Sequence, residues 1–243
     1  MSAETRVGRP FGRVAEEYER ARPEYPREAV ERAAAELGLR TDATVLELGA
    51  GTGKLTRLLA QRFARVIAVE PDDEMRRRIA GDARAGTAEQ IPLGDGEVDA
   101  VFAGDAFHWF DTSAALAEIT RVARPGGGLA LLWNDWWEKE QPPLPPPARA
   151  ILDGLFARFH VDRRESRDWR EVLERSLGPL GHAQFVVDIP YDGRRLAELC
   201  LSSSSPAALL DEERAGVAQR LHELVTGDYV VSVTTDLYWA RLQ

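Results

Sequence analysis

The chain has 243 residues, of which 44% are hydrophobic, and its 31 basic and 40 acidic residues give a net charge of -9. This length and composition suffice for a substantial buried core. The acidic balance weakens attraction to phosphate and therefore argues against a nucleic-acid partner. The basic run Arg76 to Arg78 is bracketed by acidic residues, so we interpret it as the solvated face of a helix.

Cysteine use and hydropathy point to the compartment. Cys200 is the only cysteine, so no intrachain disulfide can form. Residues 1–12 are charged and polar where a signal peptide would be apolar. No apolar stretch approaches the roughly 18 to 20 residues of a membrane-spanning helix. We therefore expect a cytoplasmic protein without membrane contact, and the dominance of arginine over lysine favours a bacterial origin.

Short continuous apolar runs predict strands covered on both faces: Val45–Leu48, Val66–Val69, Val98–Phe102 and Leu129–Trp133. Apolar residues at helical spacing lie between and before these runs. They are Val30, Ala33, Ala34 and Leu37, then Leu55, Leu58, Leu59 and Phe63, then Met75 and Ile79, and finally Leu116, Ile119 and Val122. Strands that alternate with helices predict an α/β fold with a mostly parallel sheet and helices on both faces.

The proline-rich segment 141–147 marks a break after these elements. Proline lacks an amide donor, so we expect neither regular helix nor central strand there. A stiff connector is the favoured interpretation, and a polyproline ligand is the alternative. Beyond it we predict helices at 148–159 and 167–177 and strands at 184–189 and 229–238, the last strand running antiparallel at the sheet edge.

The chain shows no internal repeat and no sign of a second core, so we predict a single domain over residues 1–243. Its predicted parts are N-terminal cap helices at 1–40, a core at 41–135, helical cap segments at 136–182 and 192–226, and the last two strands at 183–191 and 228–240.

The segment Glu47–Gly53 leads from a buried strand through alternating glycines into a helix. Glycine permits positive φ and close approach of a ligand, and the following helix presents free amides. A dinucleotide fingerprint that begins at Gly49 would need glycine at position 54, which is Lys54. A phosphate loop would need a hydroxyl where Leu55 stands. Glu70 ends the second predicted strand, where a carboxylate can accept both ribose hydroxyls of an adenosine.

This pattern resembles the E-x-G-x-G-x-G signature of class I S-adenosylmethionine (SAM)-dependent methyltransferases, of the type that includes the ubiquinone-biosynthesis and trans-aconitate enzymes. Further matches follow in order: Y-x-x-x-R-P-x-Y-P at 18–26, A-E-x-[IL]-P at 88–92, an H-W pair at 108–109 and R-x-x-[RK]-P-G-G at 121–127. The resemblance implies a Rossmann-like, seven-stranded, mostly parallel sheet with an antiparallel last strand and a helical cap. It also implies methyl transfer from SAM to an oxygen, carbon or nitrogen of a small molecule.

By resemblance, the cofactor would be held by Glu47, Gly49, Ala50, Gly51, Thr52 and Gly53, by Glu70 and Pro71 at the ribose, and by Ala88 and Glu89 at the adenine. Met75 would pack on the adenine, or it would simply fill the core. Tyr18 and Tyr25 would cover cofactor and substrate, or brace the N-terminal helix. Arg22 would bind a carboxylate, or it is a surface arginine.

For the substrate, the resemblance singles out His108 and Trp109, and the Trp-rich stretch after the fifth strand adds Trp133 and Trp136. His108 would act as a general base, or it would shape the substrate site. The tryptophans would line an apolar pocket, or they fill the core. No His is near a Cys, so no metal site is predicted. Two other functions stay open: SAM binding without methylation and, less favoured because no Y-x-x-x-K dyad is present, NAD-dependent oxidoreduction.

Overall fold

The computed structural model describes residues 15–137, 141–159 and 169–242, which fall into two compact units. The sheet unit comprises Glu24–Asp135, Arg164–Val186 and Thr234–Gln243. The helical unit comprises Met1–Pro23, Trp136–Arg163 and Val187–Val233. Each unit has a hydrophobic cluster of its own. The arrangement of the chain as one domain with a helical cap stays a prediction.

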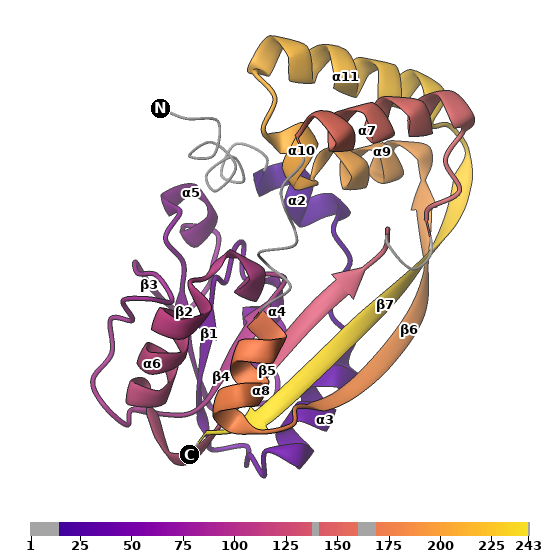
Figure 1. Cartoon of the computed structure of the whole chain (residues 1–243). Helices are drawn as coiled ribbons and strands as arrows, with labels where there is room; N and C mark the ends of the chain where they lie inside the picture. The colour runs from indigo at the N-terminus through magenta and orange to yellow at the C-terminus, as the bar shows by residue number, and fades with distance from the viewer. Residues whose placement is uncertain (1–14, 138–140, 160–168, 243) are drawn as a thin grey trace. The chain divides into compact units, whose positions relative to one another are not determined.

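The strands form one seven-stranded sheet in the order β3-β2-β1-β4-β5-β7-β6 (Figure 1). Their bounds are β1 Thr44–Leu48, β2 Arg65–Val69, β3 Asp82–Arg84, β4 Val98–Gly104, β5 Ala123–Asp135, β6 Gly181–Asp192 and β7 Asp228–Arg241. The first five strands pair in parallel, whereas β5 pairs antiparallel with β7. The predicted α/β class with an antiparallel last strand is confirmed.

The predicted position of the last strand is wrong. β7 lies between β5 and β6, so β6 forms the edge of the sheet. Burial explains the order, because Leu237 of β7 is fully buried while Val186 of β6 is 65% exposed. The short β3 forms the opposite edge of the sheet. It was not predicted, because its sequence contains no apolar run.

Alternate side chains of the strands enter different hydrophobic clusters, so the sheet is covered on both faces. On β1, Val45 belongs to one cluster and Leu46 to the other. The cluster of Val45 is completed by α3 and α4, and that of Leu46 by α6 and α8. The helices of the sheet unit are α3 Arg27–Glu36, α4 Lys54–Ala60, α5 Asp73–Arg76, the short 3-10 helix η2 Phe107–Trp109, α6 Thr112–Val122 and α8 Trp169–Leu177.

The predicted helix through Met75 and Ile79 is shorter than expected. It ends at Arg76, and Ile79 follows it. The side chain of Ile79 instead lies against Gly53, where a Cβ would come within 3.3 Å of it. Ile79 therefore packs on the glycine loop and does not continue the helical stripe.

The helical unit packs α7, α9 and α11 around a cluster of apolar side chains (Figure 1). Its helices are α2 Ala15–Ala21, α7 Pro146–Arg158, α9 Gly193–Leu201, α10 Ser204–Ala207 and α11 Asp211–Leu224. The hydroxyl of Tyr191 donates to the carbonyl of Ala21 over 2.7 Å and so holds the end of α2. The prediction that segment 141–147 contains no helix is wrong at its end. Pro146 and Pro147 begin α7, because the first turn of a helix needs no amide donors.

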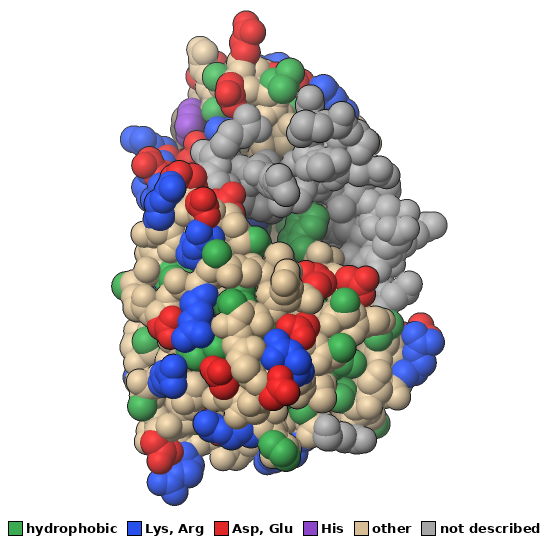
Figure 2. All heavy atoms as spheres, turned by 90° about the vertical axis from the view of Figure 1, so that its left-hand side faces the viewer, with side chains coloured by type: hydrophobic (Ala, Val, Ile, Leu, Met, Phe, Trp, Pro, Cys, Tyr) green, Lys and Arg blue, Asp and Glu red, His purple; other side chains and the backbone are tan. Residues whose placement is uncertain are grey.

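Charges of both signs alternate on the face that carries α5, β3 and α6 (Figure 2). Arg76 pairs with Asp73, and Arg77 pairs with Glu74. The predicted helical face is wrong, because α5 ends at Arg76 and the exposed residues Arg77 and Arg78 follow it. Among the described helices, none combines the length and the hydropathy needed to span a bilayer.

Candidate functional site

The glycine loop between β1 and α4 has a backbone that glycine alone adopts readily. Gly49, Gly51 and Gly53 have φ of 64°, 57° and 85°. The amide of Gly49 donates to the carbonyl of Val69 over 2.9 Å, which ties the loop to the end of β2. A Cβ on Gly49 would lie 2.7 Å from the Cβ of Ala106, whereas a Cβ on Gly51 would meet no atom within 4 Å. The loop is therefore closely packed at Gly49 and open at Gly51.

Glu70 joins this loop to the segment that follows β2. Its carboxylate accepts the amide of Gly51 over 2.8 Å and the amide of Asp72 over 2.9 Å. The side chain of Asp72 in turn accepts the amide of Met75, which is buried at the start of α5. Burial raises the pKa of Glu70, while the two amide bonds oppose that rise. A largely buried carboxylate thus faces backbone donors of the glycine loop, next to Pro71.

Glu47 lies beneath the loop at the end of β1 and is only 2% exposed. The hydroxyl of Thr56 in α4 donates to its carboxyl group. Loss of solvation raises the pKa of Glu47 to about 8, and the bond from Thr56 opposes the rise. The predicted role of Glu47 toward a cofactor stays a prediction, and Thr56 is a partner that sequence reasoning missed.

The pair Ala88 and Glu89 lies in the loop after β3. Ala88 is buried, and the exposed Glu89 accepts the amide of Asp111 over 2.9 Å. Asp111 caps α6 through the amides of Ser113 and Ala114. The hydrogen bond from Asp111 to Glu89 therefore links the loop after β3 to the start of α6. The role of Ala88 and Glu89 toward an adenine stays a prediction.

Asp105, at the end of β4, was not predicted. It is the one residue other than glycine with positive φ in the described chain, at 49°. Its carboxylate accepts the hydroxyl of Tyr25 over 2.9 Å and the amide of Asn134 over 3.0 Å. Backbone strain of this kind is often found at functional sites. The sequence feature that could have identified Asp105 is its position between the predicted strand Val98–Phe102 and the H-W pair.

His108 and Trp109 form η2 just after Asp105. The Nε1 of Trp133 donates to Nδ1 of His108 over 3.4 Å. Trp133 also stacks on Trp169 of α8, with ring centroids 4.6 Å apart. Trp109 is 40% exposed and its ring lies 4.9 Å from that of His108. The structure thus brings together two predicted substrate residues, His108 and Trp133, and adds Trp169, which the sequence did not single out.

Three predicted residues lie in the helical unit and form a group of their own. The guanidinium of Arg22 lies over the rings of Tyr18 and Trp136, at 5.2 and 5.4 Å from their centroids. Its Nε donates to the hydroxyl of Ser202 over 2.9 Å. Arg22 is thus half-buried and held by aromatic faces, unlike an ordinary surface arginine. The roles of this group toward cofactor or substrate stay predictions.

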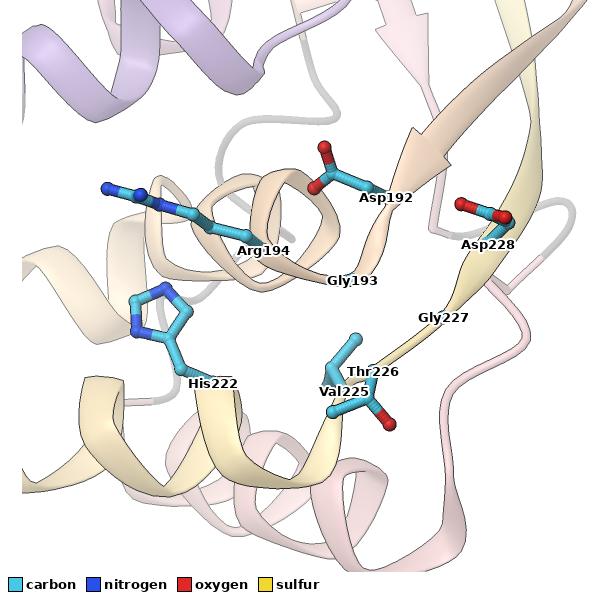
Figure 3. A pocket seen from close by; sticks show the side chains of 8 residues that line it. All are labelled: Asp192, Gly193, Arg194, His222, Val225, Thr226, Gly227 and Asp228. Carbon is cyan, nitrogen blue, oxygen red and sulfur yellow. The ribbon is translucent and has the colours of Figure 1, made fainter.

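The helical unit also has an open depression lined by residues 192–194, 222 and 225–228 (Figure 3). Arg194 and His222 extend from α9 and α11, and Asp192 and Asp228 lie at strand ends (Figure 3). The carboxylate of Asp192 accepts the amide of Arg195 over 2.8 Å and so caps α9. Arg194 pairs with Glu198, and none of the lining residues belongs to the motifs found in the sequence.

Comparisons with known proteins agree with this geometry. The family model of the methyltransferase domain matches residues 46–131. A methyltransferase-like protein of Schizosaccharomyces pombe is 44% identical over 223 residues, which are 86% of this chain and 82% of that protein. A methyltransferase of Mycobacterium tuberculosis is 46% identical over 129 residues, 51% of each protein, so the match spans about half of that relative.

A solved structure from Anaeromyxobacter dehalogenans, assigned as a type II methyltransferase, aligns with a TM-score of 0.61. It is 24% identical and covers 91% of this chain and 98% of its own, so the likeness concerns the fold.

Proposed function

Because the chain belongs to the class I SAM-dependent methyltransferase family, we propose that it binds SAM at the glycine loop and methylates a small-molecule acceptor. The proposal rests on the hydrogen bond from the amide of Gly51 to the carboxylate of Glu70. This bond brings the loop and the acidic residue of two separate motifs into one site at the carboxyl ends of β1 and β2. Ligands of open parallel sheets bind at such strand ends.

Two further observations support a bound adenosine derivative at this loop. The space above Gly51 is open, although its neighbour Gly49 is packed against Ala106. Within the described chain, the hydroxyl of Thr52 is buried and has no hydrogen-bond partner. A buried hydroxyl without a partner destabilises the free protein, and a ligand atom would relieve that cost. The donor set of the loop therefore fits the ligand that the family binds.

Each residue of the site has a defined task in this proposal. Glu70 accepts the ribose hydroxyls with the lone pairs that Gly51 and Asp72 leave open. The loop from Gly49 to Gly53 presents its backbone to the amino-acid portion, with Glu47 beneath it. Bound SAM supplies an electrophilic methyl group on a sulfonium. The chain's own contribution is to align the acceptor with that group and to exclude water.

The acceptor is proposed to be small and at least partly apolar. The aromatic side chains at the ends of β4 and β5, His108, Trp109 and Trp133, favour such a molecule. His108→Ala is accordingly expected to lower turnover while affinity for S-adenosylhomocysteine (SAH) stays within a few fold. Unchanged turnover would remove His108 from the site.

Calorimetric titration with SAM and SAH, with NADH as the competing ligand, tests the proposal. We expect micromolar binding of both sulfur ligands and none of NADH. Glu70→Ala should weaken SAH binding by roughly 10- to 100-fold, because it removes a charged acceptor. Glu97→Ala is the matched control, since Glu97 accepts the amide of Gly94 over 2.8 Å in a turn outside the loop. Binding of NADH alone would refute the proposed cofactor. If SAM binds, mass analysis of the products separates methylation from binding without methylation.

A further inference from the structure

The segment Glu24–Pro26, called the strap below, precedes α3 and is attached to the carboxyl ends of two neighbouring strands. At the end of β4, the hydroxyl of Tyr25 donates to the carboxylate of Asp105 over 2.9 Å. At the end of β5, the side-chain amide of Asn134 donates to the carbonyl of Glu24 over 3.4 Å. Ligands of open parallel sheets bind outside such strand ends, so the strap lies on the ligand-binding side of the sheet.

Two cations of α4 hold the strap as well. The carboxylate of Glu24 lies 2.8 Å from Nζ of Lys54 and 3.7 Å from Nη2 of Arg57. Lys54 directly follows Gly53, the last of the alternating glycines. Nη1 of Arg57 donates to the carbonyl of Thr52 over 3.4 Å. Glu24 therefore connects the strap to residues at the end of the glycine loop.

The ionic contact of Glu24 is weaker than the other contacts around the loop. At Gly49 and Gly53, an added Cβ would come within 2.7 and 3.3 Å of neighbouring side chains, so both positions are closely packed. The amide of Gly51 is bonded to Glu70, which is 7% exposed. The side chain of Glu24, by contrast, is 63% exposed, and ion pairs with exposed partners contribute little to stability. Because elements that move on ligand binding are weakly held, the strap is the side of the loop expected to open.

We propose that the strap is a gate of the SAM site and that Glu24 is its latch. This inference rests on the SAM binding proposed above. When Glu24 separates from Lys54, the strap moves away from the glycine loop and the ligand enters or leaves. The pair forms again once the ligand is bound. Because the closed strap is held by the same pair with and without ligand, the latch controls the rates of binding and release and leaves the affinity nearly unchanged.

Surface plasmon resonance of the full chain with SAH measures both rate constants. Glu24→Gln keeps the size of the side chain and removes its charge. We expect the association and dissociation rate constants to rise together by about 3- to 5-fold, because two ionic contacts are lost. Kd should stay within about twofold of the wild-type value. A rise in the dissociation rate constant alone would show that Glu24 contributes binding energy, and either that result or two unchanged rate constants overturns the gate.

Glu31→Gln is the matched control. Glu31 of α3 pairs with Arg62 over 2.9 Å, and its side chain is 48% exposed. Arg62 follows the opposite end of α4, so this variant loses a comparable ion pair away from the glycine loop. Its rate constants should equal those of the wild type. Equal acceleration in both variants would indicate general loosening of the fold and overturns the latch.

Acetylation of Lys54 reports on the strap without any ligand. Lys54 and Lys139 are the only lysines of the chain, so mass analysis of peptides after treatment with an N-hydroxysuccinimide ester separates the two sites. The side chain of Lys54 is only 7% exposed. Tyr25→Phe frees the strap from Asp105 and leaves the charge of Lys54 in place. We expect it to speed acetylation of Lys54 relative to Lys139 by about fivefold.

Tyr229→Phe is the control for acetylation, because the hydroxyl of Tyr229 donates to the carbonyl of Thr226 outside the strap. Equal acetylation of Lys54 in the wild type and Tyr25→Phe overturns the gate, and this comparison decides if Glu24→Gln does not fold. Calorimetry tests the proposed function separately. If the wild type binds no SAH, that function is refuted and the gate with it. If SAH binds and Glu24→Gln leaves the rate constants unchanged, only the gate is refuted.

Discussion

The carboxylate of Glu70 and the backbone amide of Gly51 lie 2.8 Å apart, and their hydrogen bond joins two loops at neighbouring strands. β1 and β2 are parallel and adjacent, so their carboxyl ends meet at one edge of the sheet. The carbonyl of Val69 adds a second link, because it accepts the amides of both Gly49 and Ala50. Cofactor affinity should consequently depend on the shape of this loop as much as on the charge of Glu70.

Gly51→Ala is expected to weaken SAH binding at least tenfold while the protein stays folded. The added methyl would enter the open space above the loop, and the left-handed backbone costs only about 1–2 kcal/mol. Gly96→Ala is a matched control, because Gly96 has φ of 63° and also has no atom within 4 Å. Both variants should lose similar stability in thermal unfolding. Equal SAH affinity of the two in calorimetry would contradict a ligand at the loop.

Glu47→Gln is expected to stabilise the protein at alkaline pH. Burial raises the pKa of Glu47 from 4.5 to about 8, so the folded state keeps a proton that the unfolded state has lost. The free energy of unfolding should therefore fall as pH rises from about 4.5 to about 8. Glutamine stays neutral, and its stability advantage at pH 8.5 should be about 2–4 kcal/mol.

Urea unfolding of the ligand-free protein at pH 5.5, 7.0 and 8.5 measures this difference. Glu28→Gln, in the exposed first turn of α3, is the control and should follow the wild type. Parallel pH profiles for wild type and Glu47→Gln would show that the buried carboxyl keeps an ordinary pKa.

Tyr25→Phe is expected to lower stability by about 1 kcal/mol, because Asp105 loses one of its buried donors. The strained backbone of Asp105 then depends on the amide of Asn134. Tyr229→Phe serves as the control, since that hydroxyl donates to the carbonyl of Thr226 at an exposed site. Chemical denaturation of both variants gives the comparison. Equal stability of the two would mean that the bond between Tyr25 and Asp105 contributes nothing.

Glu118 should contribute to acid stability. Its ion pair with Arg121 lowers the pKa of Glu118 from 4.5 to about 2. The stabilisation is thus complete above pH 4.5 and is lost as pH falls toward about 2. Glu118→Gln should cost about 1–2 kcal/mol at pH 6 and much less at pH 2.5. Glu174→Gln removes an exposed pair with Arg170 and should cost little at either pH. A constant difference across pH would exclude a titrating pair.

Much of the fold could be predicted from local patterns. Continuous apolar runs such as Val66–Val69 indicated buried parallel strands, and the structure confirms them. The alternating glycines Gly49, Gly51 and Gly53 indicated a loop with positive φ, and the structure has it. Glycine adopts positive φ readily because it has no Cβ to clash with the backbone. These properties depend on residues that are close in the chain, so sequence alone determined them.

Strand order and the partners of the candidate site were decided by tertiary structure. β7 lies between β5 and β6, where side chains such as Leu237 are buried by residues distant in the chain. Tyr25 and Asp105 are 80 residues apart, and Arg22 and Ser202 are 180 apart. Trp133 of β5 likewise donates to His108 of η2. Hydrogen bonds over such separations form only when the chain is folded, so no local pattern could reveal them.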